Sequence, residues 1–283
     1  MFKFLFLFLL LATSLRGVEY HSLSGYLQLN PFAYDLGLVL HQGKSDDEDI
    51  LLCCHGYSGD EKLASILNTY EVISDHLVGF RFPDAGHFAL IRPAHLLAYG
   101  TIHELLPLLH MMKRIAVDAS ADRINLYGFS AGGGAIINAL TVLVEQRYIS
   151  ELEQIGIGPK ESQKILSAVQ KGMIILDCPL KSLDEISAFR GPFSPLDILR
   201  ERYASNNLRP IDSISGLSSL KLNVLLYFED PDEILSNRDD ALFIKRLRTA
   251  NARGETHVVI GHEGGHMAYH APLWNTYLGL TPK

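Results

Sequence analysis

The sequence predicts an α/β fold, in which a twisted and mostly parallel β-sheet carries helices on both of its faces. Two observations favour this class. Apolar segments of strand length alternate along the chain with longer segments whose apolar residues recur at helical spacing. Most of the strand-like segments are unbroken apolar runs, which is typical of parallel strands buried on both faces.

The predicted strands share this apolar character, and the first two should form an antiparallel pair. In order, the predicted strands are 18–29, 33–42, 49–54, 76–82, 123–127, 172–177, 222–228 and 257–260. The predicted helices share apolar positions three and four residues apart. In order, they are 61–74, 101–119, 131–147, 159–171, 238–251 and 266–278.

Composition sets the size of the fold and its class of partner. The chain has 283 residues, of which 47% are hydrophobic and 20% are charged. This is enough apolar material for one large core, so we expect a single domain over residues 18–283. The formal net charge of −7 argues against nucleic acid or an anionic membrane surface as a partner.

The first 17 residues have the pattern of a secretory signal peptide. Lys3 precedes a short apolar run, and small residues follow at Ala12, Ser14 and Gly17. The apolar run is shorter than the roughly 20 residues that a membrane-spanning helix needs. We therefore expect a secreted or periplasmic protein, with no stable membrane insertion once the signal is removed. An uncleaved N-terminal anchor is the alternative.

Three cysteines are present, and none predicts a disulfide. Cys53 and Cys54 are adjacent within an apolar strand, so their side chains should point to opposite faces. Cys178 ends another apolar strand. All three are typical of small buried hydrophobic residues. A cysteine nucleophile is the alternative, but no cysteine lies on a turn like that of Ser130.

The segment Gly128-Phe129-Ser130-Ala131-Gly132 lies between a predicted strand and a predicted helix. A serine in this G-x-S-x-G pattern occupies a sharp, strained turn, and a Cβ at either glycine would meet the packed strand or helix. The helix N-terminus would direct free N–H groups at negative charge formed near Ser130. The pattern predicts a nucleophilic serine. An incidental serine in a glycine-rich turn is the alternative.

Acidic residues and histidines follow the last two predicted strands. After 222–228 come the carboxylates Glu229, Asp230, Asp232 and Glu233, and Asp177 ends the strand before that. After 257–260 come His262 and His266, with His270 further on. A histidine can take the proton of a serine hydroxyl, and a carboxylate can orient that histidine.

Together, Gly128–Gly132, the His55-Gly56 pair after an earlier strand and the order serine, acid, histidine make the chain similar to the α/β-hydrolase superfamily. The resemblance covers nearly all of residues 18–283. It implies that His266, on a glycine turn before a helix, is the base in preference to His262. It also implies that Asp232 is the acid in preference to Asp230, Glu229 or Asp177. Apart from the resemblance, His270 is more typical of a packing residue, and a loop this rich in carboxylates is typically solvated, so we expect the remaining ones to be solvated.

The resemblance implies two further features. The oxyanion of the tetrahedral intermediate would be bound by the backbone N–H groups of Ala131 and Tyr57, with His55 shaping the loop. A cap over the active site would be inserted at residues 179–219, between the sixth and seventh core strands. Its apolar lining would come from Phe189, Phe193, Leu196, Ile198 and Tyr203. An ordinary long connection is the alternative.

The segment from His262 to His266 also fits the H-E-x-x-H pattern of zinc peptidases. That chemistry needs a helix, so that both histidines share one face. A strand precedes the motif here, and its middle residues are Gly264 and Gly265, which disfavour a helix. We therefore expect neither a metal nor a cofactor.

These observations predict a serine hydrolase that cleaves a carboxylic ester of a small acyl substrate. Ser130 would be the nucleophile, with His266 and Asp232 completing the triad. A serine peptidase or a thioesterase on the same fold is one alternative. A catalytically silent member of the superfamily that acts as a binding module is another.

Overall fold

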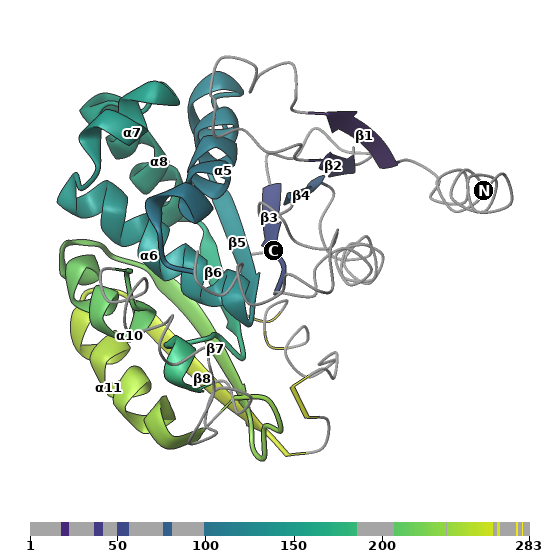
Figure 1. The fold of residues 1–283 in the computed structure, drawn as a ribbon, viewed down its shortest axis with the longest axis vertical. Coiled ribbons are helices and arrows are strands. Elements are labelled where there is room, and N and C mark those ends of the chain that lie inside the picture. Colours follow the sequence, from purple (N-terminus) through teal and green to yellow (C-terminus); the bar gives the residue numbers. More distant parts are fainter. Residues whose placement is uncertain are drawn as a thin grey trace, which may run out of the picture.

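The computed structural model describes residues 18–22, 37–41, 50–56, 76–80, 99–185, 207–235, 237–262, 265–266, 276 and 279. Within these residues, strands from both halves of the chain form one sheet with the order β1-β2-β4-β3-β5-β6-β7-β8 (Figure 1). The sheet's strands are β1 Val18–Ser22, β2 Gly37–His41, β3 Ile50–Cys54, β4 His76–Phe80, β5 Ile124–Phe129, β6 Met173–Asp177, β7 Asn223–Glu229 and β8 Glu255–Gly261.

The sheet is parallel except at one edge. Strand β1 pairs antiparallel with β2, with Val18 opposite His41, and β2 pairs antiparallel with β4. Every other neighbouring pair, from β4–β3 to β7–β8, is parallel. The predicted antiparallel pair at the start of the chain and the mostly parallel sheet are both confirmed.

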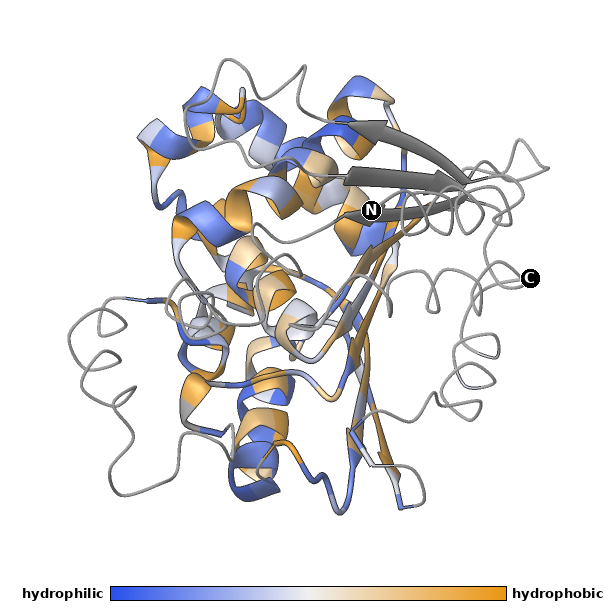
Figure 2. Cartoon of the chain, turned by 45° about the vertical axis from the view of Figure 1, so that its right-hand side comes forward, coloured by the Kyte–Doolittle hydropathy of each residue, from blue (hydrophilic) through white to orange (hydrophobic). Residues whose placement is uncertain are grey.

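The described helices lie along one side of the sheet (Figure 2). The α-helices are α5 Ile102–Lys113, α6 Ala131–Glu145, α7 Ile149–Gln154, α8 Pro159–Lys171, α10 Pro210–Ser213 and α11 Asp240–Ala250. A π-helical turn, Arg114–Asp118, extends α5, and the 3₁₀ turns are Leu183–Glu185, Ile214–Ser219 and Asn237–Asp239. Among these helices none combines the length and the apolar character that crossing a membrane requires.

The core follows the alternation of side chains along the parallel strands. Alternate residues such as Leu52, Leu126 and Leu226 pack with α5, α6, α8 and α11 in one buried cluster. The opposite face is buried too, since Leu51 and Ile175 are fully inaccessible to solvent. Burial on both faces explains why these strands are continuous apolar runs.

The parallel strands all end on the same side of the sheet, and the register brings the last residues of neighbouring strands together. Phe129 at the end of β5 lies opposite Asp177 of β6, which lies opposite Tyr227 of β7. Glu229, the last residue of β7, lies opposite Gly261 of β8. The residues that follow these strands therefore meet at one end of the sheet.

The predicted elements that overlap described ones agree with them to within a few residues at each end, except that residues 23–29 of the strand predicted at 18–29 lie outside the described residues. Helix α8 has the predicted bounds, and the helix predicted at 101–119 consists of α5 and the π-helical turn. Helices α7 and α10 were not expected from the sequence. The predicted signal peptide 1–17 and the helix 61–74 lie outside the described residues, as does nearly all of the helix predicted at 266–278.

Candidate active site

Ser130 lies on the turn between β5 and α6 in a backbone conformation that side chains rarely adopt. Its φ is 51° and its ψ is −117°. Neighbouring backbone holds this conformation, because Ser130 N–H donates to the Asp177 carbonyl at 2.9 Å and the Ser130 carbonyl accepts from Leu180 N–H at 2.9 Å. A strained residue that its surroundings fix in this way is typical of a functional position.

Glycines on either side of Ser130 permit close packing. A Cβ at Gly132 would lie 2.2 Å from the Cys54 carbonyl oxygen, and a Cβ at Gly128 would lie 2.6 Å from the Gly133 Cα. The contacts that the sequence predicted for the two glycines of the motif are therefore present. They bring the start of α6 against the end of β3.

Replacing Gly132 with alanine should lower the free energy of unfolding by about 3 kcal/mol, because the added Cβ meets backbone that cannot rotate away. Thermal or urea unfolding of the purified variant measures the loss. Gly279→Ala is the matched control, since a Cβ there has no atom within 4 Å. A Gly132→Ala protein as stable as the wild type would contradict this packing.

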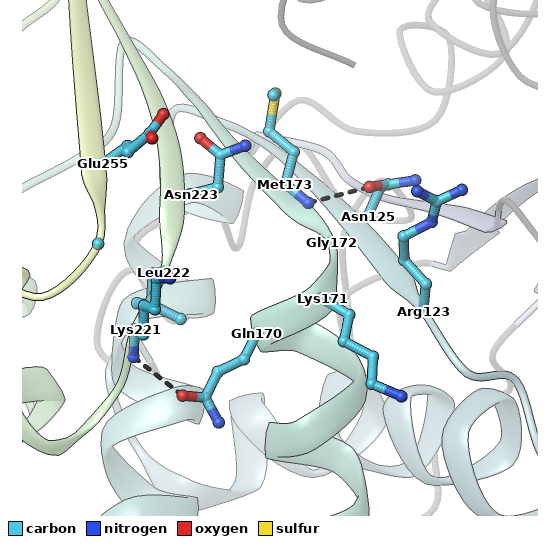
Figure 3. A pocket seen from close by; sticks show the side chains of 11 residues that line it. Arg123, Asn125, Gln170, Lys171, Gly172, Met173, Lys221, Leu222, Asn223 and Glu255 are labelled. Atoms are coloured by element: carbon cyan, nitrogen blue, oxygen red, sulfur yellow. Dashed lines mark hydrogen bonds between the residues drawn. The ribbon is translucent and has the colours of Figure 1, made fainter. Parts of the chain in front are cut away.

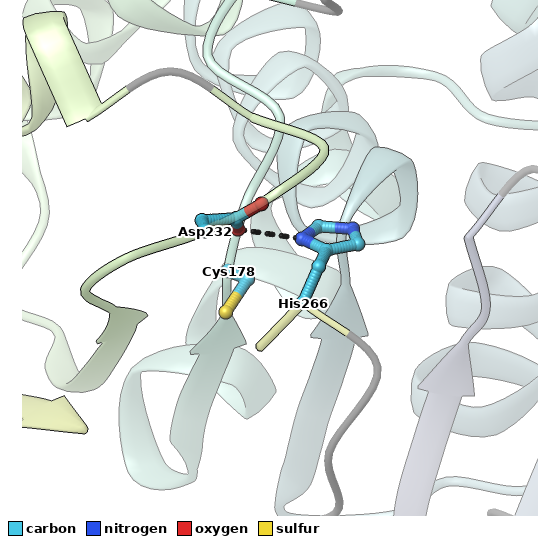
Figure 4. A group of neighbouring side chains, drawn as sticks. All are labelled: Cys178, Asp232 and His266. Carbon is cyan, nitrogen blue, oxygen red and sulfur yellow. Dashed lines mark hydrogen bonds and ion pairs between the residues drawn. The ribbon is translucent and has the colours of Figure 1, made fainter. Parts of the chain in front are cut away.

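His266 joins Ser130 to Asp232. The His266 Nε2 atom lies 3.0 Å from the Ser130 hydroxyl oxygen, and its Nδ1 atom lies 2.7 Å from Asp232 Oδ2. Figure 4 shows the second of these contacts. The His266 ring packs against the Phe129 ring, with centroids 5.1 Å apart, and the residue is only 2% exposed. A buried ring held from three sides has a fixed orientation.

Asp232 is held in its ionised form. Its Oδ1 atom accepts hydrogen bonds from Ile234 N–H at 2.8 Å and Leu235 N–H at 2.7 Å. Burial alone would raise the pKa of Asp232, but the hydrogen bonds from His266, Leu235 and Ile234 outweigh it and leave the pKa below its usual value. Asp232 can therefore accept from His266 Nδ1–H and stabilise an imidazolium.

The other acids near the site have other partners. Asp177 is buried and accepts from the Tyr127 hydroxyl at 2.7 Å, and burial raises its pKa to about 7. Buried Glu229 accepts from the Tyr227 hydroxyl. Exposed Asp230 accepts from the Asn237 amide at 2.7 Å. Of these acids, Asp232 is the one hydrogen-bonded to the imidazole of His266.

Glu233 has a role that sequence reasoning missed. Its Oε2 atom accepts from the His266 backbone N–H at 2.9 Å, so it joins the loop after β7 to the loop after β8. Gly265, with a φ of +67°, leaves room for this carboxylate. The expectation that the carboxylates of this loop other than Asp232 are solvated is wrong for Glu229, which is buried, and incomplete for Glu233. The sequence signal was the row of acids itself, which does not indicate a partner 33 residues away.

His262 has a different partner from His266. It is exposed, and its Nδ1 atom lies 3.0 Å from the Asp230 carbonyl oxygen. Strand β8 ends at Gly261, and neither His262 nor Gly265 is helical. The helical face that an H-E-x-x-H zinc site needs is therefore missing from the described part of this segment. Glu263 and His270 lie outside the described residues.

Of the two residues expected to bind the oxyanion, the structure describes Ala131. Ala131 is the first residue of α6 and is buried beside Ser130. Tyr57 lies outside the described residues, but Gly56 before it would bring a Cβ to 3.2 Å from the Ser130 Cβ. His55 is fully buried, and its Nδ1 atom contacts the Gly56 carbonyl. Gly56, two residues after the end of β3, therefore packs against Ser130.

The segment expected to form a cap is described at its two ends. Residues 207–219 pack on α6, where the Asn138 amide donates to the Leu208 carbonyl at 3.2 Å and the Thr141 hydroxyl donates to the Ser213 carbonyl at 2.8 Å. Ile211, Ile214 and Leu217 belong to the main core. This end of 179–219 is part of the body of the domain. The five residues expected to line the cap lie outside the described residues.

All three cysteines are free and buried, as the sequence predicted. Cys53 and Cys54 lie in β3. Cys178, however, directly follows β6, and its sulfur lies beside the Asp232–His266 pair (Figure 4). The sequence placed this residue at a strand end but did not predict its neighbours.

A cavity of about 260 Å³ lies at the opposite end of the parallel strands, where they begin (Figure 3). It is lined by residues at or next to the starts of β5, β6, β7 and β8, among them Arg123, Asn125, Met173, Asn223 and Glu255. None of its lining residues belongs to the group around Ser130. The two regions are therefore separated by the length of the strands.

Searches for known relatives find structures but no sequence match. No family model matches the chain, and no curated protein sequence does. A lipase/esterase from Lactobacillus plantarum is 16% identical with a TM-score of 0.59, over 94% of this chain and 99% of that one. The carboxylesterase Cest-2923 from Lactobacillus plantarum WCFS1 is 17% identical with a TM-score of 0.58, over 88% and 84%.

Porphyromonas gingivalis dipeptidyl peptidase 4 is also similar, at 14% identity and a TM-score of 0.58, over 93% of this chain and 34% of that one. Identities this low show a common fold. The strand order, the parallel pairing and these neighbours together establish the α/β-hydrolase fold for this chain.

Proposed function

We propose that this protein is a serine hydrolase that cleaves a carboxylic ester through Ser130, His266 and Asp232. The observation that carries the proposal is the continuous set of contacts from the Ser130 hydroxyl, through the imidazole, to an ionised carboxylate. The strained turn at Ser130 supports it, because such a turn presents the hydroxyl at the end of the sheet. A catalytically silent binding module would have no need of this geometry.

The first half-reaction forms an acyl-enzyme. The Ser130 oxygen attacks the carbonyl carbon of the ester while His266 Nε2 accepts the hydroxyl proton. The N–H groups of Ala131 and Tyr57 donate to the oxyanion that forms, and each such donor contributes about 3–4 kcal/mol. When the C–O bond to the alcohol breaks, the imidazolium gives its proton to the departing oxygen. Asp232 stabilises the cation throughout.

The second half-reaction uses the same groups. Water enters where the alcohol left, and His266 Nε2 takes one of its protons as the oxygen attacks the acyl carbon. The imidazolium then returns the proton to the Ser130 oxygen, and the carboxylic acid is released. No cofactor is needed for either step.

A small acyl ester is the substrate class that the neighbours favour. Est1E from Butyrivibrio proteoclasticus is similar in fold and has been seen with ferulic acid bound. Thermogutta terrifontis esterase 2, another structural neighbour, has been seen phosphonylated by sarin. The dipeptidyl peptidase among the neighbours makes a peptide bond the second candidate.

Rates on p-nitrophenyl esters of increasing acyl length, measured beside a thioester and aminoacyl p-nitroanilides, test the reaction class. We expect the highest kcat/KM on an ester. Cleavage of the anilides alone would make the protein a peptidase. No cleavage of any of these substrates by folded protein would favour the binding module.

Activity should survive prolonged chelation, and His262→Ala should lower the rate by less than about tenfold, because that histidine contacts a backbone carbonyl and not the serine. Ester hydrolysis after dialysis against a chelator, run beside the variant, measures both effects. Activity that is lost on chelation and restored by zinc would contradict the serine mechanism.

We further propose that residues 1–17 are a cleaved export signal and that the mature protein is secreted or periplasmic. The basic residue, short apolar run and small residues of this segment support the proposal. Mass spectrometry of protein from its native host should find an N-terminus between Leu15 and Val18. Protein that keeps Met1 in a membrane fraction would be anchored instead.

A further inference from the structure

Cys178 lies close to the triad but takes no part in the reaction described above. Its Sγ atom, a nitrogen of His266 and a carboxylate oxygen of Asp232 all lie within 4.8 Å of one another. Figure 4 shows the thiol beside the hydrogen-bonded pair. The position is well defined, because Cys178 N–H donates to the Tyr227 carbonyl at 2.9 Å and the residue is 1% exposed.

These donors suit one kind of ligand. A thiolate, an imidazole and a carboxylate are the groups that bind Zn²⁺, at about 2.3 Å for sulfur and about 2.0–2.2 Å for nitrogen and oxygen. Donors around a tetrahedral ion with these bond lengths lie about 3.3–3.8 Å apart. The Nδ1 atom of His266 and Oδ2 of Asp232 are already 2.7 Å apart. Small side-chain rotations would therefore let all three reach a common ion.

We propose that Cys178, Asp232 and His266 form an inhibitory site for a thiophilic divalent cation such as Zn²⁺. Three protein ligands leave a fourth position for water. The ion would replace the hydrogen bond between His266 and Asp232, so binding and catalysis exclude each other. The inhibition rests on the proposed function, because it presumes the serine reaction. The binding of the metal does not rest on it.

The protons balance in a way that explains the inhibition. On binding, the thiol proton of Cys178 is released to solvent and the sulfur bonds to the ion. Nδ1 of His266 also bonds to the ion, so the imidazole proton moves from Nδ1 to Nε2. A protonated Nε2 cannot accept the proton of Ser130. The thiolate, the carboxylate and the divalent ion together carry no net charge, which suits a buried position.

Without the ion, the thiol is inert. Burial, followed by the Asp177 and Asp232 carboxylates, raises the pKa of the Cys178 thiol well above its usual value. The group is therefore protonated at neutral pH and does not compete with Ser130 as a nucleophile. A cation that displaces the thiol proton would turn Cys178 into a metal ligand.

Two measurements on the purified full-length protein test the site. The first is ester hydrolysis in buffered Zn²⁺, each variant being compared with its own rate without metal. We expect the half-inhibiting Zn²⁺ concentration to rise at least about tenfold in Cys178→Ala and Cys178→Ser. Mutating a residue that only hydrogen-bonds a metal ligand already weakens metal binding by that much, and these variants remove a ligand itself. Cys53→Ala, which removes a buried thiol elsewhere, is the control and should respond as the wild type does.

The second is the ultraviolet charge-transfer band of a cadmium–thiolate bond, recorded as Cd²⁺ is added. The band should form in the wild type, in Cys53→Ala and in the inactive Ser130→Ala protein, and be absent from both Cys178 variants. Equal Zn²⁺ inhibition with and without Cys178, or no band in the wild type, would overturn the proposal. A band in protein that cleaves no ester would support the site and contradict the proposed function.

Discussion

Replacing Ser130 with alanine is expected to lower kcat for ester hydrolysis by about 10⁴- to 10⁶-fold, because a catalytic triad acts as a unit and this change removes the atom that attacks. The hydroxyl is the one group that contacts His266 Nε2 in the described part of the site. The nearby Cys178 thiol does not replace it, since it remains protonated.

The fold should survive this change. Alanine keeps the Cβ, so the φ of 51° is no more strained than before. The backbone hydrogen bonds to the Asp177 carbonyl and from Leu180 N–H do not involve the removed oxygen. Steady-state kinetics and a thermal melt on the same preparation measure kcat and the melting temperature. Full activity in a Ser130→Ala protein that melts as the wild type does would exclude a serine mechanism.

Replacing Asp232 with asparagine is expected to lower kcat by about 10⁴-fold. The asparagine amide can donate to Nδ1 of His266 but the carboxylate can only accept, so the substitution favours the tautomer whose proton lies on Nε2. That tautomer cannot take the Ser130 proton. The size of the loss reflects an ionised acid that sits 2.7 Å from Nδ1.

Matched variants separate this effect from a general loss of charge. Asp230→Asn changes an exposed carboxylate two residues away, and Asp177→Asn changes a buried one bound to the Tyr127 hydroxyl. Both should retain most of the activity. If either were the inactive variant while Asp232→Asn was nearly normal, the acid would be misassigned although the fold would stand.

The core of the fold could be predicted because its signals are local. Parallel strands buried on both faces consist of apolar runs, so β3, β5, β6 and β7 are recognised from a few residues each. Strand β8 was predicted too short. It is an edge strand whose residues are mostly half exposed, and its first two residues, Glu255 and Thr256, are polar and so do not extend an apolar run. The longer helices between these strands could be predicted because their apolar residues recur three and four positions apart.

Two of the elements that the sequence did not predict, α7 and the π-helical turn, were missed for clear physical reasons. Helix α7 has six residues and no side-chain cap, and it begins after a left-handed Tyr148. Its stability comes from tertiary contacts of residues such as Leu152. The π-helical turn after α5 differs from an α-helix by one residue in its hydrogen bonding, and apolar spacing does not resolve that difference.

For the site, the sequence predicted the turn that carries Ser130 and placed the acids and histidines after the right strands. It could not predict contacts between loops. The hydrogen bond from His266 N–H to Glu233 spans 33 residues and depends on how the two loops fold. Buried charges were missed for a similar reason: Lys181 is 1% exposed because Glu185 and Asp240 pair with it.

The central claim is that Ser130 is the nucleophile, and a covalent probe tests it most directly. Purified protein is treated with a fluorophosphonate, digested and mapped by tandem mass spectrometry. We expect a single phosphonate adduct on Ser130, no adduct in Ser130→Ala and much slower labelling in Asp232→Asn. An adduct on another residue, or esterase activity that persists in fully treated protein with Ser130 unmodified, would contradict the assignment.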